Sequence, residues 1–238
     1  MHRIGLIALF WLLTLTVCGQ IIIGTTGLMN TPTADMRPAG TFDGGASWAH
    51  KELLHDRTYN MGIFYISFTP FSWMEISFRE STMKWEKNSK KYNNLDRSTT
   101  VRICPLPEGK YWPSVVLGGN DIYSLTKKGS KYACFFGVAT KHIEFPHFGI
   151  FGISAGYAKP HKKGTAYDGV FGGLSFSPAF LPEMKVMGDY DTRGFNVGAS
   201  ALLFRHLNLT CFTNEFKGVN GTISYQYTIK YKQARKDA

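Results

Sequence analysis

Apolar and polar residues alternate strictly along many segments of this chain. The clearest segment covers residues 222–231, in which the odd positions are Ile or Tyr and the even positions are polar. Residues 74–79 and 195–203 repeat the pattern. A period of two places one kind of side chain on each face of an extended strand. Because Gly and β-branched residues occupy the positions where a helix needs good helix formers, the pattern predicts an all-β chain.

About twelve strands can be placed in this way. Their lengths approach the roughly 9–11 residues that a tilted strand needs to cross a bilayer. They are predicted near residues 41–50, 58–69, 73–80, 98–104, 112–122, 131–143, 148–158, 168–176, 183–190, 194–204, 207–216 and 220–231.

The connectors between these strands alternate in length. Every second connector is short, at residues 70–72, 105–110, 144–147, 177–182 and 205–206, and four of these five contain Pro. Most of the others are longer and more basic, as at 81–97, 123–130 and 159–167, although 191–193 and 217–219 are also short. Outer-membrane barrels have short periplasmic turns and longer external loops. The pattern predicts a barrel whose two ends both lie on the periplasmic side.

The first residues predict export. A basic start at residues 1–3 precedes an apolar run at 4–17 that is too short to span a bilayer. We expect a signal peptide at 1–19, cleaved after Gly19, with lipidation of Cys18 as the alternative. Residues 20–40 then form an N-terminal segment before the barrel at 41–232, and a basic tail follows at 233–238. The three remaining cysteines, an odd and sparse set, predict wall residues and no disulfide framework.

A secreted, soluble β-sandwich that binds carbohydrate would show the same alternation, because it also buries one face. Aromatic residues at the predicted strand ends favour a membrane barrel, because such residues form girdles at the membrane surfaces. The candidates for these girdles are Trp48, Trp73, Trp112, Tyr157, Tyr190 and Tyr231. We therefore predict a single antiparallel up-and-down transmembrane β-barrel in a bacterial outer membrane, exposed to its lipid and lipopolysaccharide.

If the apolar side chains face lipid, the polar ones line the lumen. The residues expected there are Asp43, Glu75, Arg79, Arg102, Lys185, Asp189, Asn196, Gln226 and Lys230. Mixed charges in a narrow lumen pair with one another, because an unpaired buried charge is costly. Two interpretations stay open, a salt-bridged interior that closes the pore and a path for ions or sugars past these groups.

The net positive charge of the chain indicates anionic partners. The chain has a formal net charge of +10 at pH 7, and basic residues gather in the predicted loops. Phosphate groups of lipopolysaccharide or an acidic polysaccharide could bind there, or the loops could form a solvated rim. The residues concerned are Lys90, Lys91, Lys127, Lys128, Lys162 and Lys163. No nucleic-acid-binding motif is present, so no nucleic-acid partner is expected.

No catalytic, cofactor-binding or metal-binding motif emerges. His142 and Ser154 fall on neighbouring predicted strands, as the Ser and His of a barrel lipase could, but no Gly-x-Ser-x-Gly sequence supports such a site. The histidines form no His-Glu-x-x-His pattern, and the Gly-rich stretches lack the Gly-Lys-Ser/Thr ending of a phosphate loop. We expect a protein that is not an enzyme and needs no cofactor.

The N-terminal segment carries a sharper motif. Gly24, Gly27, Leu28 and then Pro32-Thr33-Ala34 follow the order Gly-x-x-Gly-Leu-x-x-x-Pro-Thr-Ala. This resembles the start of YjbH-type proteins, an exopolysaccharide-biosynthesis family predicted to form outer-membrane barrels. Residues 188–191, Gly-Asp-Tyr-Asp, and 196–198, Asn-Val-Gly, look like a strand end and the following strand of that family.

The resemblance implies a role in making or exporting extracellular polysaccharide, with polysaccharide and export-machinery proteins as partners. A general small porin is the alternative. Physically, the two glycines permit unusual backbone angles and Pro32 fixes one. The segment could therefore enter the barrel as a plug or line its periplasmic mouth, or it could be a turn-rich lead-in that covers an edge.

Overall fold

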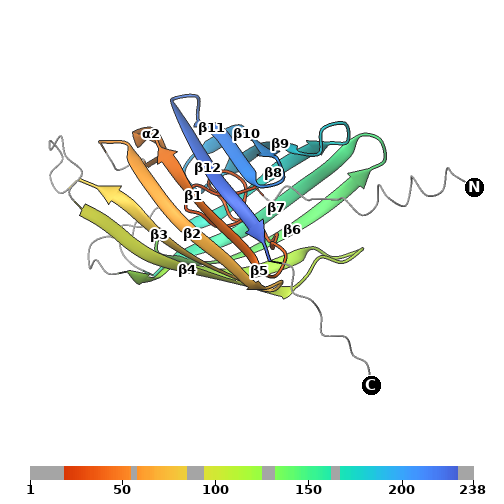
Figure 1. Ribbon diagram of the computed structural model, residues 1–238, viewed down its shortest axis with the longest axis horizontal. Helices are drawn as coiled ribbons and strands as arrows, with labels where there is room; N and C mark the ends of the chain where they lie inside the picture. Colours follow the sequence, from red (N-terminus) through yellow and green to blue (C-terminus); the bar gives the residue numbers. More distant parts are fainter. Residues whose placement is uncertain (1–18, 55–57, 85–93, 125–131, 162–166, 230–238) are drawn as a thin grey trace, which may run out of the picture.

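Twelve antiparallel strands form one closed ring in a computed structural model (Figure 1). The structure describes residues 19–54, 58–84, 94–124, 132–161 and 167–229. The strands are β1 (Thr41–Ala49), β2 (Met61–Phe71), β3 (Met74–Met83), β4 (Asn94–Leu106), β5 (Ser114–Ser124), β6 (Cys134–Phe145), β7 (Gly149–Pro160), β8 (Gly169–Pro178), β9 (Met184–Tyr190), β10 (Phe195–Leu203), β11 (Leu207–Asn214) and β12 (Gly218–Thr228). One short helix, α2 (Lys51–Leu54), follows β1.

Each strand pairs with its neighbours in the sequence, and β1 closes the ring against β12, from Thr41 opposite Thr228 to Trp48 opposite Gly221. Closure leaves no unpaired edge, which a bilayer requires because lipid cannot satisfy free backbone groups. The predicted single up-and-down barrel is confirmed, and the two-sheet sandwich is excluded. The predicted strand positions agree with the structure to within a few residues.

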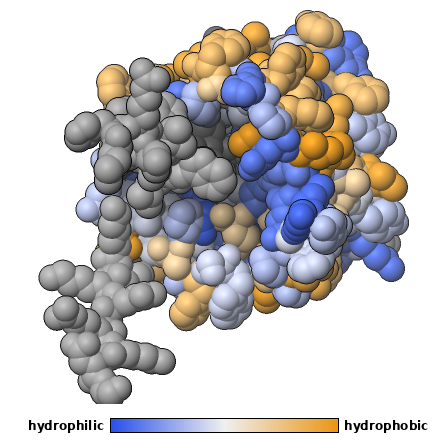
Figure 2. All heavy atoms as spheres, turned by 90° about the vertical axis from the view of Figure 1, so that its right-hand side faces the viewer, coloured by the Kyte–Doolittle hydropathy of each residue, from blue (hydrophilic) through white to orange (hydrophobic). Residues whose placement is uncertain are grey.

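The outer wall is apolar. Phe64, Leu117, Leu174 and Ile223 are exposed, and along each strand such outward-facing residues alternate with inward-facing ones. Five of the six predicted girdle aromatics, Trp48, Trp73, Trp112, Tyr157 and Tyr190, are exposed on strands or strand ends, and Tyr231 lies outside the described residues. Figure 2 looks onto the end that carries the short turns, with hydrophobic side chains around the outline and hydrophilic ones towards the middle. The wall is therefore suited to contact with lipid.

Among the described residues, no helix is long and apolar enough to cross a membrane.

The barrel interior is filled by the chain's own N-terminal segment. Residues 20–34 are all buried, and in Figure 1 this red segment lies inside the ring of strands. We call residues 20–40 the plug. The plug supplies Ile21, Ile22, Ile23, Leu28 and Met29 to an apolar cluster. The wall completes the cluster with inward residues such as Ile63, Val116, Phe136, Val138 and Phe171. The sequence predicted a lumen lined by polar residues, so this apolar cluster was missed.

Candidate functional site: the plugged lumen

The plug has a compact fold of its own. Isolated bridges join Gln20 to Thr26 and Gly27 to Pro32. Gly24 has φ +89°, a region that L side chains rarely adopt. An added Cβ at Gly27 would lie 2.3 Å from Ile21 Cγ2 and 2.4 Å from the Thr31 carbonyl oxygen. These two positions of the N-terminal motif therefore need glycine because the chain turns and packs too closely for a side chain.

Charged residues join the plug to β1, β3 and β4. Glu75 Oε2 accepts a hydrogen bond from Arg102 Nη1 at 2.6 Å, and its Oε1 lies 3.5 Å from Arg37 Nη1. Arg37 Nη2 lies 3.4 Å from Asp43 Oδ2. We call Asp43, Arg37, Glu75 and Arg102 the inner charge network. All four are at most 2% exposed, so each charge depends on its neighbours for compensation.

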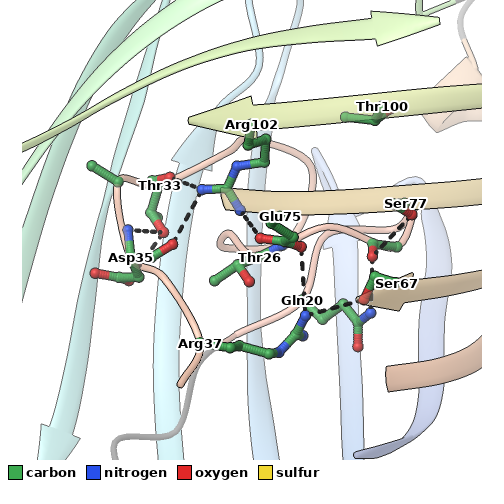
Figure 3. A network of polar contacts seen from close by, with 12 residues as sticks. Gln20, Thr26, Thr33, Asp35, Arg37, Ser67, Glu75, Ser77, Thr100 and Arg102 are labelled. Carbon is green, nitrogen blue, oxygen red and sulfur yellow. Dashed lines mark hydrogen bonds and ion pairs between the residues drawn. The ribbon is translucent and has the colours of Figure 1, made fainter. Parts of the chain in front are cut away.

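The inner charge network also holds the plug backbone (Figure 3). Thr26 N donates to Glu75 Oε1 at 3.0 Å. Arg102 Nη2 donates to the carbonyl oxygens of Thr33 and Asp35. Ala34 N donates to Thr140 Oγ1 on β6 at 2.7 Å. The plug is therefore bound to the wall along most of its length, and not merely enclosed.

A second set of contacts fixes the middle of the plug to β9 and β10. Asp189 Oδ2 accepts hydrogen bonds from the backbone N–H groups of Met29, Asn30 and Thr31 at 2.9–3.2 Å. Asn196 Nδ2 donates to Asp189 Oδ1 at 2.6 Å, and Asn30 Nδ2 donates to Asp191 Oδ2 at 2.5 Å. We call Asp189, Asp191 and Asn196 the plug latch. The N-terminal glycine motif and residues 188–198, which both resemble sequences of YjbH-type proteins, therefore contact each other.

Tyr167, in the connector between β7 and β8, covers the latch. Its hydroxyl donates to the carbonyl oxygen and to Oδ1 of Asn30. Burial, and then the negative charge of Asp191, raise the pKa of the Tyr167 hydroxyl well above its usual value. The hydroxyl therefore stays protonated and keeps donating to the plug.

Gln20 joins the plug to the seam where the ring closes. Its Nε2 donates to Asp43 Oδ1 on β1 at 2.9 Å. Its Oε1 accepts from Ser224 Oγ on β12 at 2.7 Å. One plug side chain therefore bridges the first and last strands.

The predicted lumen residues make different contacts in the structure. Four of them contact the plug directly: Asp43, Glu75, Arg102 and Asp189. Asn196 contacts Asp189, and Lys185 is buried on the inner wall. Arg79 is buried further along β3, where its Nη2 pairs with Asp121 and its guanidinium lies over the Tyr132 ring. Gln226 is half-buried opposite Asp43. Lys230 lies outside the described residues, as do Lys90, Lys91, Lys127, Lys128, Lys162 and Lys163.

Sequence reasoning missed Gln20, Asn30, Arg37, Asp121 and Tyr167. Four of them lie outside the strands, where alternation says nothing about direction. Asp121 lies on β5 with φ 54°, next to a register shift between β4 and β5. There both Asn120 and Asp121 are buried, so strict alternation fails at this point.

His142 and Ser154 do not contact each other in the way a catalytic pair needs. Ser154 Oγ shares a hydrogen bond with Thr140 Oγ1 at 2.9 Å. His142 Nδ1 lies 2.7 Å from Glu108 Oε2, and Nε2 lies 3.6 Å from Asp35 Oδ1 of the plug. Within the described part of the chain, no group of three or more His, Cys, Asp or Glu side chains could hold a metal ion.

Glu108 lies in the turn between β4 and β5, beside His142 and Lys141. Partial burial raises its pKa, but hydrogen bonds from the His142 amide and ring and from Lys141 outweigh that effect, so the pKa is lowered overall. Lys141 Nζ lies 2.9 Å from Glu108 Oε1. With Asp35 on the other side of His142, this group ties the end of the plug to the turn end of the barrel.

Two solved structures of outer-membrane phospholipases are similar to this chain. The chain is similar to the outer membrane phospholipase (OMPLA) dimer with bound calcium from Salmonella typhi, with 9% identity, a TM-score of 0.38 and coverage of 82% of this chain and 92% of that one. It is also similar to outer membrane phospholipase A from Escherichia coli, with 7% identity, a TM-score of 0.37 and coverage of 82% and 94%. No curated protein matches the chain.

A family model described as "Exopolysaccharide biosynthesis protein YbjH" matches residues 20–172, well over half of the chain. The match begins at the first residue of the plug and runs through β7 into β8. The resemblance carried by the N-terminal motif is thereby confirmed. This plugged barrel belongs to the YjbH family of exopolysaccharide biosynthesis proteins.

Proposed function

We propose that this protein is an outer-membrane barrel that serves the export or assembly of exopolysaccharide, without catalysis, and that its plug closes the lumen until it is displaced. The observation that carries the proposal is the complete burial of residues 20–34 inside the ring of strands. All three cysteines in the described part of the chain are free. A plug that is held there by hydrogen bonds and ion pairs can have a second position.

The polar chemistry of the lumen supports a hydrophilic cargo. Once the plug moves, Glu75, Arg102, Asp189 and Asp191 would lose their plug partners and would need new ones. Sugar hydroxyls can both donate and accept, so they suit all four side chains. The family supports polysaccharide as the cargo. A permanently open general porin is less well supported, because the plug fills its path.

A gene deletion tests the role. Loss of the gene is expected to reduce the exopolysaccharide at the cell surface, and a plasmid copy is expected to restore it. Cell fractionation is expected to place the protein in the outer membrane. Unchanged polysaccharide in the deletion strain would contradict the proposed role.

A reversible cross-link tests plug displacement. Ala34→Cys and Thr140→Cys, in a background without the native cysteines, place thiols at two positions that are already hydrogen-bonded neighbours. Oxidation is expected to stop complementation, and reduction is expected to restore it. The two single variants are the controls, because neither can form the bond. Equal complementation by the oxidised double variant would show that the plug need not move.

A further inference from the structure

Lys185 is a buried lysine without a partner. It lies on the inner face of β9 and is only 8% exposed. It forms no hydrogen bond and no ion pair with any residue that the structure describes. Asp189, four positions further along the same strand, is already occupied, because its oxygens accept from the plug backbone and from Asn196. An ammonium group that is removed from water needs an anion to compensate its charge.

Three polar side chains with unused groups lie beside Lys185. Ser200 on β10 is directly opposite Lys185, and Thr210 on β11 is directly opposite Ser200. The hydroxyl oxygens of Ser200 and Thr210 are buried without a hydrogen-bond partner, and so is Oδ1 of Asn208, two positions before Thr210. All three side chains are at most 4% exposed. We call Lys185, Ser200, Asn208 and Thr210 the lumen lysine site.

The lumen lysine site lies to one side of the contacts that hold the plug. Met187, the next inward residue of β9, belongs to the apolar cluster that the plug helps to form. Leu202, the inward residue next to Ser200 on β10, is buried but lies outside that cluster. Lys185 is the second residue of β9 and follows the short turn after β8, so the site lies towards the end that is predicted to face the periplasm.

The free groups of the site suit an acidic sugar. The ammonium group of Lys185 can donate to a carboxylate in a charge-assisted hydrogen bond, which is stronger than a neutral one. The two hydroxyls and the Asn208 amide can both donate and accept, as sugar hydroxyls do. Leu202, directly opposite Asn208, offers an apolar surface to a sugar ring. A neutral sugar would leave the charge of Lys185 without compensation.

We propose that the lumen lysine site binds a carboxylate-bearing sugar unit, with the carboxylate on Lys185 and the ring hydroxyls on the three polar side chains beside it. The proposal rests on the proposed function, because it takes polysaccharide as the cargo and adds that this polysaccharide is acidic. The site receives the cargo on the turn-end side of the plug, before the plug is displaced.

Isothermal titration calorimetry of the full-length protein in detergent tests the proposal, with trigalacturonate as the probe and its methyl ester as the neutral comparison. The ester is expected to bind about tenfold or more weakly than trigalacturonate. Lys185→Gln is expected to weaken trigalacturonate binding about tenfold or more, whereas Lys185→Arg keeps most of it because the positive charge remains. Asn208→Ala is expected to weaken it about fivefold. A fast-migrating band on an unboiled gel verifies that each variant is folded.

Two comparisons separate this site from a general effect of charge. Lys159→Gln removes the same charge from the exposed face of β7 and is expected to bind trigalacturonate as the wild type does. Acetate carries a carboxylate without a sugar and is expected not to compete at equal concentration. Equal binding of the methyl ester, equal loss in Lys159→Gln, unchanged binding by Lys185→Gln, or equal competition by acetate would overturn the proposal.

The binding site and the export role can fail separately. If Lys185→Gln loses trigalacturonate binding but the gene deletion leaves exopolysaccharide unchanged, the site is supported and the export role is wrong. If the deletion reduces exopolysaccharide but trigalacturonate binding does not depend on Lys185, the export role is supported and the site is wrong.

Discussion

At the scale of single residues, Glu75 has the most demanding position. It is completely buried, accepts hydrogen bonds from Arg102 and from the plug backbone, and forms an ion pair with Arg37. Sequence could predict that Glu75 faces the lumen, because it alternates with apolar residues along β3. It could not predict Arg37 as a partner, because Arg37 lies outside any strand, and a charge in irregular backbone has no periodicity to reveal its direction.

Replacing Glu75 by Gln removes the charge that compensates Arg37 and Arg102. Breaking a buried pair in this way is expected to cost about 3–5 kcal/mol. Urea unfolding in detergent, followed by tryptophan fluorescence, measures the change in the free energy of unfolding. Glu80→Gln is the control, since Glu80 pairs with Arg97 on the exposed face and is expected to cost at most about 1 kcal/mol. Equal effects would show that burial of the inner charge network has no energetic importance.

Glu108, in the short turn between β4 and β5, is expected to make the stability of the folded protein depend on pH. Its pKa is lowered in the folded protein from the usual 4.5. The ionised carboxylate therefore stabilises the folded state above pH 4.5, and this contribution is lost as the pH falls through the lowered pKa. Glu108→Gln is expected to flatten that part of the stability profile, measured by thermal unfolding from pH 6 down to about pH 3. An unchanged profile would exclude Glu108 as the cause.

At the scale of elements, the strands were predictable, whereas for the N-terminal segment the sequence left a plug as one of several alternatives. Alternation identifies strands because one side of the wall is apolar and the other polar, and turn length and Pro identify their ends. The plug has neither periodicity nor a uniform polarity, since Ile21, Ile22 and Ile23 are consecutive and all are buried. Its glycine motif indicated unusual backbone, but its binding to Asp189 depends on contacts across about 160 residues of sequence.

Gly27→Ala tests the fit of the plug. The added Cβ would overlap Ile21 and the Thr31 carbonyl, and such overpacking costs about 1–3 kcal/mol. The population of the displaced plug is expected to rise about tenfold for each 1.4 kcal/mol. Planar-bilayer conductance is expected to show more frequent openings than the wild type.

Gly44→Ala is the control for that measurement. Gly44 lies on β1, and an added Cβ there would meet its nearest atom, the Tyr65 carbonyl oxygen, only at 3.8 Å. This variant is expected to conduct as the wild type does. If both variants opened equally, the effect would come from the barrel wall and not from the plug.

At the scale of the whole molecule, the barrel, the plug and the seam form one unit. A closed barrel was predicted from the alternating lengths of the connectors and from the aromatic residues at the strand ends. The role of Gln20 at the seam could not be predicted, because it depends on the relative positions of β1, β12 and the plug in the folded protein. The unit as a whole is expected to resist unfolding until the seam opens.

Gln20→Ala is expected to lower the temperature at which the fast-migrating folded band is lost on an unboiled gel. The substitution removes hydrogen bonds to Asp43 and Ser224 and leaves buried polar groups with fewer partners, which costs about 1–3 kcal/mol. Thr213→Ala, on the half-buried face of β11, is expected to behave as the wild type does. A slow band for the unheated wild-type protein would contradict a stable barrel.

The contact of Gln20 with both ends of the ring has a consequence for biogenesis. The plug comes first in the sequence, but its partners include Asp189 and Ser224, which are among the last parts to be made. Native contacts across such long separations form late and slowly. The plug can therefore reach its final position only when the last hairpins arrive, so the newly made barrel becomes sealed in the same step that completes its folding.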